Sequence, residues 1–272
     1  MKTLHDVVRS QTDYQPLIDA HRAGSSLDVR DASGATPLHH ALRSLRDTII
    51  PSPAYALLAL GASPDLADAA GVRPLHLACE GNKADAAFLL LALGADPHRP
   101  DHSGRTPHDC LAGNTRTSFK ARQGRVAAWL AGEPLPVVTE SLLVAAADYS
   151  SRPALLIRRG ADLGARDAEG NTALHTAVST STMAALLALG ADPSATNVRG
   201  ETPLHIACRG GSGIGLLVGN GADPRIRDVS GRLAVDGLRA QSFAHDFYDG
   251  DRLEWLRKEK IRRLEAAAAA LG

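Results

Sequence analysis

Histidine is the residue type of this chain that most invites a chemical interpretation, since eleven are present and an imidazole can bind a metal or transfer a proton. Four of them, His39, His76, His175 and His205, occupy equivalent places in similar strings. A metal site needs ligands that converge on one point, whereas residues spaced by whole repeats lie along a stack. His40 follows His39 directly, and adjacent helical residues do not face one ligand, so we predict a neutral surface histidine there. The histidines therefore predict no metal site.

Other catalytic and cofactor signatures are missing from the sequence. It contains no G-x-S-x-G, Walker G-x-x-x-x-G-K-[ST] or H-E-x-x-H string. The glycine-rich stretch 210–215 favours a tight turn between helices over a phosphate loop, because no strand is expected before it. Cys79 and Cys208 are predicted to be small packed residues, and the three cysteines, with Cys110, form no CxxC pair. We therefore predict a protein without catalytic residues or a cofactor.

Charge and composition restrict the class of partner and the cellular location. Thirty basic residues balance thirty acidic ones and only 4% of residues are aromatic, which disfavours nucleic-acid binding. Residues 1–10 are charged and unlike a signal peptide, and the longest apolar run, 84–94, is about half the length that spans a bilayer. We expect a cytoplasmic protein without membrane insertion, and signal-independent secretion stays open. The excess of arginine over lysine and the abundant alanine are typical of a GC-rich bacterial genome.

The four histidines belong to a repeat of about 33 residues. The string Gly-x-Thr-Pro-Leu-His, with variations, begins at Gly34, Gly71, Gly104, Gly170 and Gly200, spaced 37, 33, 66 and 30 residues apart. A second string, Gly-Ala-Asp-Pro or a variant, begins at Gly61, Gly94, Gly160, Gly190 and Gly221. The chain here resembles the ankyrin family, whose Thr-Pro-Leu-His-x-Ala signature and period it shares over about residues 31–236.

Each repeat predicts two helices and a hairpin. Threonine can cap the first helix, proline suits its first position, and a glycine such as Gly94 can end the second helix. The Asp-x-x-Gly turn that follows predicts a projecting hairpin. The resemblance implies an all-α solenoid of about six to seven repeats including caps. It also implies that the histidines tie helix starts to neighbouring hairpins, a network we expect to break at Arg73 and Asp109, which replace threonine and histidine.

The ends and the middle of the array depart from this pattern. Residues 17–24 are predicted to be half a repeat, and residues 251–271 a closing helix. The third repeat is irregular, with its second helix expected at 125–131, and the next module, with a helix at 141–147, lacks the Asp-x-x-Gly-x-Thr hairpin. We expect one domain over residues 1–272, an open crescent with sub-stacks 1–132 and 133–272 and an irregular joint near 112–140, where the curvature changes.

The resemblance implies a partner protein on the concave face, across the hairpin tips and the exposed side of the first helices. The expected partner-binding residues are Arg43, Glu80, His102, Arg105, Arg166, Glu169, Arg199, Glu201, Arg209, Arg227 and Arg232. Asn114 and Thr180 are two further expected first-helix positions. The second hairpin is small and apolar while the later ones carry arginines. We hypothesise that an acidic segment docks on Arg166, Arg199, Arg227 and Arg232; the alternative that these arginines only solvate the edge stays open.

The predicted function is a non-catalytic protein-interaction module, monomeric alone, that acts as an inhibitor, immunity-type protein, adaptor or scaffold. The alternatives are a regulatory or targeting subunit of an enzyme assembly, or a secreted effector that binds a host protein. The irregular segment 114–138 is too short for a catalytic domain, and its polar residues lack a paired acid and base.

Overall fold

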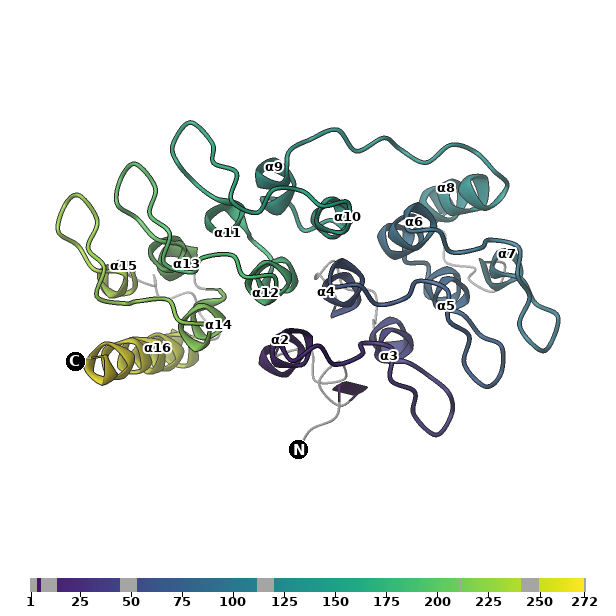
Figure 1. Cartoon of the computed structure of the whole chain (residues 1–272), viewed down its shortest axis with the longest axis horizontal. Helices are drawn as coiled ribbons and strands as arrows, with labels where there is room; N and C mark the ends of the chain where they lie inside the picture. The colour runs from purple at the N-terminus through teal and green to yellow at the C-terminus, as the bar shows by residue number, and fades with distance from the viewer. Residues whose placement is uncertain are drawn as a thin grey trace.

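The computed structural model describes residues 4–5, 14–44, 53–111, 120–210, 212–240 and 250–271. Regular structure in these ranges is helical, apart from an isolated bridge between Arg227 and Leu233. Short helices lie in pairs and the chain between pairs projects as hairpins (Figure 1). The predicted fold class, an all-α solenoid of helix pairs with hairpin fingers, is confirmed.

The helices form two groups, which we call the first stack, residues 14–132, and the second stack, residues 141–271. The first stack holds α2 (Gln15–Arg22), α3 (Pro37–Ser44), α4 (Pro53–Ala59), α5 (Pro74–Glu80), α6 (Ala84–Ala92), α7 (Pro107–Leu111) and α8 (Lys120–Leu130). The second stack holds α9 (Leu142–Ala146), α10 (Arg152–Arg158), α11 (Ala173–Thr176), α12 (Thr180–Ala188), α13 (Pro203–Gly210), α14 (Ile214–Gly219), α15 (Ala234–Arg239) and α16 (Gly250–Ala270).

Hairpins of successive repeats stack on one another within each group. The Val229 N–H donates to the Arg199 carbonyl at 2.9 Å, and the Ala69 N–H donates to the Ser33 carbonyl at 3.0 Å. Glycine is required where they approach: Gly200 has φ +70°, and a Cβ there would lie 3.0 Å from the Val229 nitrogen. The turn glycines that suggested the repeat therefore also set the spacing between neighbouring hairpins.

The two stacks pack against each other through their second helices, a contact that the repeat pattern does not predict. Helix α12 contacts α2 and α4, and α10 contacts α4 and α6 (Figure 1). The Arg22 Nη2 donates to the Leu187 carbonyl at 2.8 Å, and the Asn220 Nδ2 donates to the Gln15 Oε1 at 2.8 Å. The expectation of one open crescent with a change of curvature is wrong, because the chain turns back on itself at residues 131–141.

The sequence does contain a signal for this packing, in second helices that carry consecutive large apolar residues. In α6 the consecutive residues Leu89 and Leu90 are both 0% exposed, and in α12 Leu186 and Leu187 are likewise 0% exposed. Consecutive helical residues point in different directions, so a helix buried at both must be covered on opposite sides. One side meets its own stack and the other meets the opposite stack.

The structure corrects two of the helix positions that the sequence predicts around and beyond the joint between the stacks. Residues 131–141 form no hairpin, as expected, and α9 begins after Ser141, whose Oγ accepts from the Val144 N–H at 3.4 Å. Helix α8 begins at Lys120, five residues before the expected start. Thr180 starts the second helix α12, since α11 has only four residues, so it is not a first-helix position; Asn114 lies outside the described residues.

The predicted end elements are confirmed. Helix α2 has the place of the second helix of a half repeat, and α16, a helix of 21 residues, packs on α14 and α15. Over the part of the chain that the structure describes, no helix combines the length and apolar character needed to cross a bilayer.

Candidate protein-interaction surfaces

The four repeat histidines fasten each helix start to the next hairpin. The His205 Nδ1 accepts from the Thr202 N–H at 3.1 Å, so in the neutral ring Nε2 carries the proton and donates to the Arg232 carbonyl at 3.2 Å. The rings of His39 and His175 make the same pair of contacts, and burial lowers the pKa of both. The structural role that the resemblance implied is confirmed.

Arginine in place of threonine does not break this network. The Arg73 N–H donates to the His76 Nδ1 at 3.2 Å, and the His76 Nε2 donates to the Arg105 carbonyl at 3.0 Å. The expected break at Arg73 is therefore wrong, because the donor is a backbone group that every residue except proline has. At Asp109 the Oδ2 accepts from the Thr106 N–H at 2.8 Å, which keeps the cap, and the repeat that follows has no hairpin to tie.

An aspartate, or in one hairpin an asparagine, accepts the backbone hydrogen bonds that shape each hairpin. The Asp228 Oδ1 accepts from the Ser230 N–H at 2.8 Å and the Arg232 N–H at 2.9 Å, and its side chain is 3% exposed. The backbone N–H of Arg232, together with its side chain, lowers the pKa of this carboxyl despite burial. Asp101 and Asp68 are arranged in the same way, and Asn197 uses its Oδ1 for the same turn. Each carboxylate leaves its second oxygen facing outward.

Arginines cover these buried acids in the second stack. The Arg232 Nε and Nη2 both lie 2.8 Å from the Asp228 Oδ2, while 63% of the arginine side chain stays exposed. The Arg199 Nε donates to the Glu201 Oε2 at 2.8 Å, with 57% of its side chain exposed. These guanidinium groups are thus held in place and still reach solvent.

Glu201 lies buried beneath the side chains of two arginines and is not exposed at the tip of its hairpin. Its side chain is 4% exposed and accepts from both Arg199 and Arg209. Burial alone would raise the pKa of Glu201, but hydrogen bonds from Arg209, Arg199 and Asn197 lower it to about 2. The expected exposure of Glu201 is corrected accordingly, since a partner would meet the arginines above it.

The side chains of Arg166 and Arg227 donate hydrogen bonds to backbone carbonyls of the hairpins on which they lie. The Arg166 Nη1 donates to the Gly170 carbonyl at 2.8 Å and to the Thr196 carbonyl of the next hairpin at 2.7 Å. The Arg227 Nη1 donates to the Gly231 carbonyl at 2.6 Å. Both side chains also remain exposed, so each combines a structural contact with a place on the surface.

Two exposed valines lie beside these arginines and were not among the expected partner-binding residues. Val198 is 67% exposed and Val229 is 75% exposed, and both follow the residue that builds their hairpin. The equivalent residues of the first two hairpins of the first stack are Ala32 and Ala69. Valine at a hairpin tip is a signal the sequence could have provided, because a solvated turn gains nothing from a β-branched apolar side chain.

Comparison with known proteins decides the family. A family model described as ankyrin repeats, in three copies, matches residues 4–101 and 142–228. The chain belongs to the ankyrin-repeat family. It is also similar to a solved structure described as the ankyrin repeat domain of Bcl-3, a unique member of the IkappaB protein family, with 24% sequence identity over 93% of this chain and 98% of that chain. The TM-score is 0.34, so the assignment rests on the family model and the repeat geometry. A comparison with curated proteins finds no match.

The ankyrin hairpins form two rows that point to opposite sides of the molecule. Hairpins of the first stack lie at the lower right of Figure 1 and those of the second stack at the upper left. The first row carries four of the expected partner-binding residues: Arg43 and Arg105, paired with Asp68 and Asp101, and the exposed Glu80 and His102. The second row carries Arg166, Glu169, Arg199, Glu201, Arg209, Arg227 and Arg232. The expected residues are thus divided between two surfaces.

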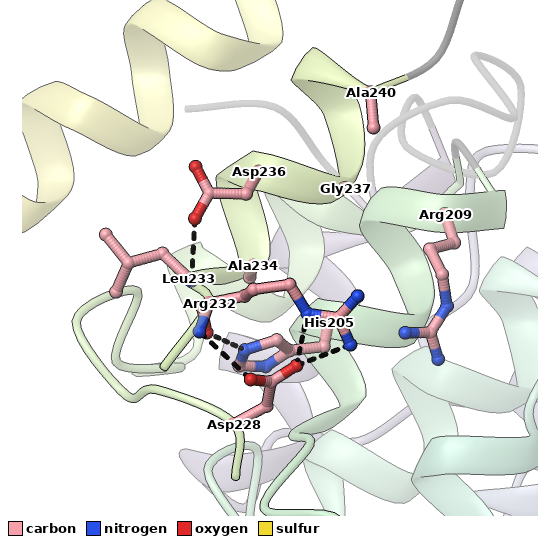
Figure 2. Close-up of a pocket in the computed structure, with 9 residues that line it drawn as sticks. All are labelled: His205, Arg209, Asp228, Arg232, Leu233, Ala234, Asp236, Gly237 and Ala240. Atoms are coloured by element: carbon pink, nitrogen blue, oxygen red, sulfur yellow. Dashed lines mark hydrogen bonds and ion pairs between the residues drawn. The ribbon is translucent and has the colours of Figure 1, made fainter. Parts of the chain in front are cut away.

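A small pocket of the ankyrin array lies between α13 and α15, with a volume of about 180 Å³ (Figure 2). Arg209 reaches it from α13, and Arg232 and Asp236 line it from the following hairpin and α15. The polar groups that Figure 2 links are satisfied by one another: Arg232 pairs with Asp228, and Asp236 accepts from the Leu233 N–H at 2.9 Å. The pocket therefore extends the surface of the second row and needs no ligand of its own.

The buried cysteines of these repeats are packed residues, as predicted. Cys79 is 1% exposed and Cys208 is 0% exposed, and burial raises the pKa of each thiol to about 12. A thiol with such a pKa is a poor nucleophile at neutral pH, because the thiolate is the reactive form.

Proposed function

We propose that this ankyrin-repeat protein is a non-catalytic module that binds an acidic, partly apolar segment of a partner protein along the hairpin row of its second stack. Ankyrin repeats generally mediate protein–protein interactions. The observation that carries the choice of surface is the alternation of exposed valine and held arginine on adjacent hairpins, at Val198, Arg199, Val229 and Arg232.

Preorganised arginines support an acidic ligand. A free arginine loses rotamer freedom when it is fixed in a complex, at a cost of about 0.5–1.5 kcal/mol. Arg232 and Arg199 are already oriented by buried carboxylates. A guanidinium has five N–H donors, and each buried acid engages one edge of the group, so the exposed edge can donate to a carboxylate of the partner.

Exposed valines support an apolar component in the same segment. Val198 and Val229 lie on neighbouring hairpins that are joined by the hydrogen bond from the Val229 N–H to the Arg199 carbonyl. A partner that covers both removes apolar surface from water, while adjacent arginines fix its register. A partner segment with acidic residues flanking one or two apolar side chains fits this arrangement.

Capture from native cell extract tests the proposal, with the whole chain as bait. We expect the Val198→Asp/Val229→Asp variant to lose its partner by at least about tenfold in affinity, since it removes apolar contact and adds charge that repels an acidic segment. The matched control is Ala32→Asp/Ala69→Asp, which makes the same change on the equivalent hairpins of the first stack. Equal retention by both variants would contradict the proposal, and so would equal loss.

An adaptor is the role that the arrangement of the two rows favours among the interaction roles. Because the rows point to opposite sides, a partner on one row leaves the other accessible. An adaptor would capture two proteins, one lost with each double variant, whereas an inhibitor or immunity-type protein would capture one. A regulatory subunit would be distinguished by a captured enzyme whose rate changes when the chain is added in equal amount.

A further inference from the structure

The first hairpin is the one whose acid is met by a histidine. In three of the later hairpins the outward carboxylate oxygen is met by an arginine: Arg43 for Asp68, Arg105 for Asp101 and Arg232 for Asp228. In a fourth, the Asp167 Oδ2 accepts from the Asn171 Nδ2 at 3.0 Å. At Asp31 the residue in that place is His40, whose Nε2 lies 2.7 Å from the Asp31 Oδ2. A histidine differs from an arginine in one chemical respect that matters here, since neutral imidazole can bind a metal and a guanidinium cannot.

A second histidine reaches the same place from the chain that precedes helix α2. The His5 and His40 rings are perpendicular, with centroids 5.2 Å apart. One ligand atom each from His5, Asp31 and His40 lies within 4.8 Å of the other two. The expectation that His40 is a simple surface histidine is thus corrected, as its side chain is 11% exposed and faces two possible ligands.

We propose that His5, Asp31 and His40 bind a zinc ion, which fastens residue 5 to the first hairpin and α3. Two imidazole nitrogens and one carboxylate oxygen, with water as the fourth ligand, form a tetrahedral donor set that suits zinc. Ligand atoms about 2.0–2.1 Å from the ion lie about 3.3 Å apart. The side chains therefore need to move by an ångström or two, with the pair at 2.7 Å separating and the third ligand approaching.

Hydrogen bonds outside the donor set hold two of the ligands as zinc sites require. The Asp31 Oδ1 accepts from the Ser33 N–H at 2.8 Å, the Ser33 hydroxyl at 2.6 Å and the Ala35 N–H at 3.0 Å, which orients Oδ2 toward His40. The His5 Nε2 lies 3.1 Å from the Ala35 carbonyl. A carbonyl only accepts, so Nε2 carries the proton of the neutral ring and Nδ1 keeps its lone pair, the arrangement in which metal-bound histidines donate to backbone carbonyls.

Calorimetric titration of the full chain with Zn²⁺ tests the site. We expect one equivalent to bind, and His5→Ala, Asp31→Asn and His40→Leu each to weaken binding by at least about tenfold, because each removes a ligand. Asp31→Asn and His40→Leu each introduce a residue that another repeat already has at that position. Asn197 builds a hairpin without a carboxylate, and Leu77 is the equivalent of His40 in the next repeat. The control is His102→Ala, an exposed hairpin histidine outside the cluster, which should bind as the wild type does.

Absence of zinc uptake by the wild type would overturn the proposal, as would variants of the cluster that bind zinc unchanged or a His102→Ala variant that binds as weakly as they do. His5→Ala is the deciding variant if another fails to fold, since residue 5 precedes α2 and Asp31 and His40 lie in the first hairpin and α3. A second measurement keeps the test independent of calorimetry. Zinc should raise the unfolding temperature of the wild type by more than that of His5→Ala at the same zinc concentration, and equal increases would overturn the proposal.

Discussion

The two stacks use the same repeat to present different surfaces. Inside the repeats they agree: in both stacks histidines fasten helix starts, an acid or asparagine builds each hairpin, and glycine allows neighbouring hairpins to approach. Outside they differ, since the first row shows Ala32 and Ala69 where the second shows Val198 and Val229. Residues that face a neighbouring repeat therefore specify the fold, while residues that face solvent specify what the fold can bind.

A charged residue between the stacks is expected to have the largest effect. Ala185 of α12 is 1% exposed and lines the same narrow gap as Ala59 and Ala154. Ala185→Glu would bury a charge without a partner and cost about 3–5 kcal/mol, separating two stacks that each keep their hairpins. Urea denaturation and the radius of gyration from small-angle scattering measure the two effects. The control is Leu189→Glu, because Leu189 is the C-cap of the same helix and is 38% exposed. This substitution should change neither the free energy of unfolding nor the radius of gyration by much.

Loss of a repeat histidine should come next, and should cost more than loss of Asp109, which replaces the histidine in the third repeat. His205→Ala leaves the buried Thr202 N–H and the Arg232 carbonyl without their partner, at a cost of about 2–3 kcal/mol. Asp109→Ala removes a cap that has no following hairpin, and should cost about 0.5–1 kcal/mol. Thermal unfolding of both variants tests this order. Equal losses would show that the link between repeats contributes nothing beyond the cap.

The buried carboxylate of the second stack should make stability depend on pH. The pKa of Glu201 is lowered from its ordinary 4.5 to about 2, so its contribution is present above about pH 4.5 and is lost as the pH falls toward 2. At pH 7 we expect Glu201→Gln to be less stable than the wild type by about 1–2 kcal/mol, and the difference to shrink over that window. Val72→Gln, the same position in the first stack, should show a difference that pH does not change.

The smallest expected effect concerns the solvent-facing valines. Val198→Asp/Val229→Asp should change the free energy of unfolding by no more than about 0.5 kcal/mol, because both side chains are exposed and make no side-chain hydrogen bond in the wild type. Ala32→Asp/Ala69→Asp should behave alike. Thermal unfolding checks both. A large destabilisation would mean that the valines support the fold, and that loss of a partner could not be assigned to the surface.

Much of the fold could be predicted, since each repeat is specified by local chemistry. The helix starts, the hairpin acids and the roles of His39 and His205 follow from residues within about 40 positions of one another. The candidate surface was predicted less well. Glu201 was expected at a tip and lies beneath two arginines, because its burial depends on Arg209 from the following helix, eight residues away.

By itself, the sequence determined the repeat, the ends of the array and the irregular segment between its two halves, because these depend on short-range patterns of threonine, proline, histidine and glycine. The tertiary structure alone decided that the halves pack back to back, with their hairpin rows on opposite sides. It also decided that His5 meets Asp31 and His40. The physical reason is that residues 131–141 form no helix or strand, so their local conformation does not fix the orientation of the second stack relative to the first. Burial of the apolar second helices fixes that orientation instead.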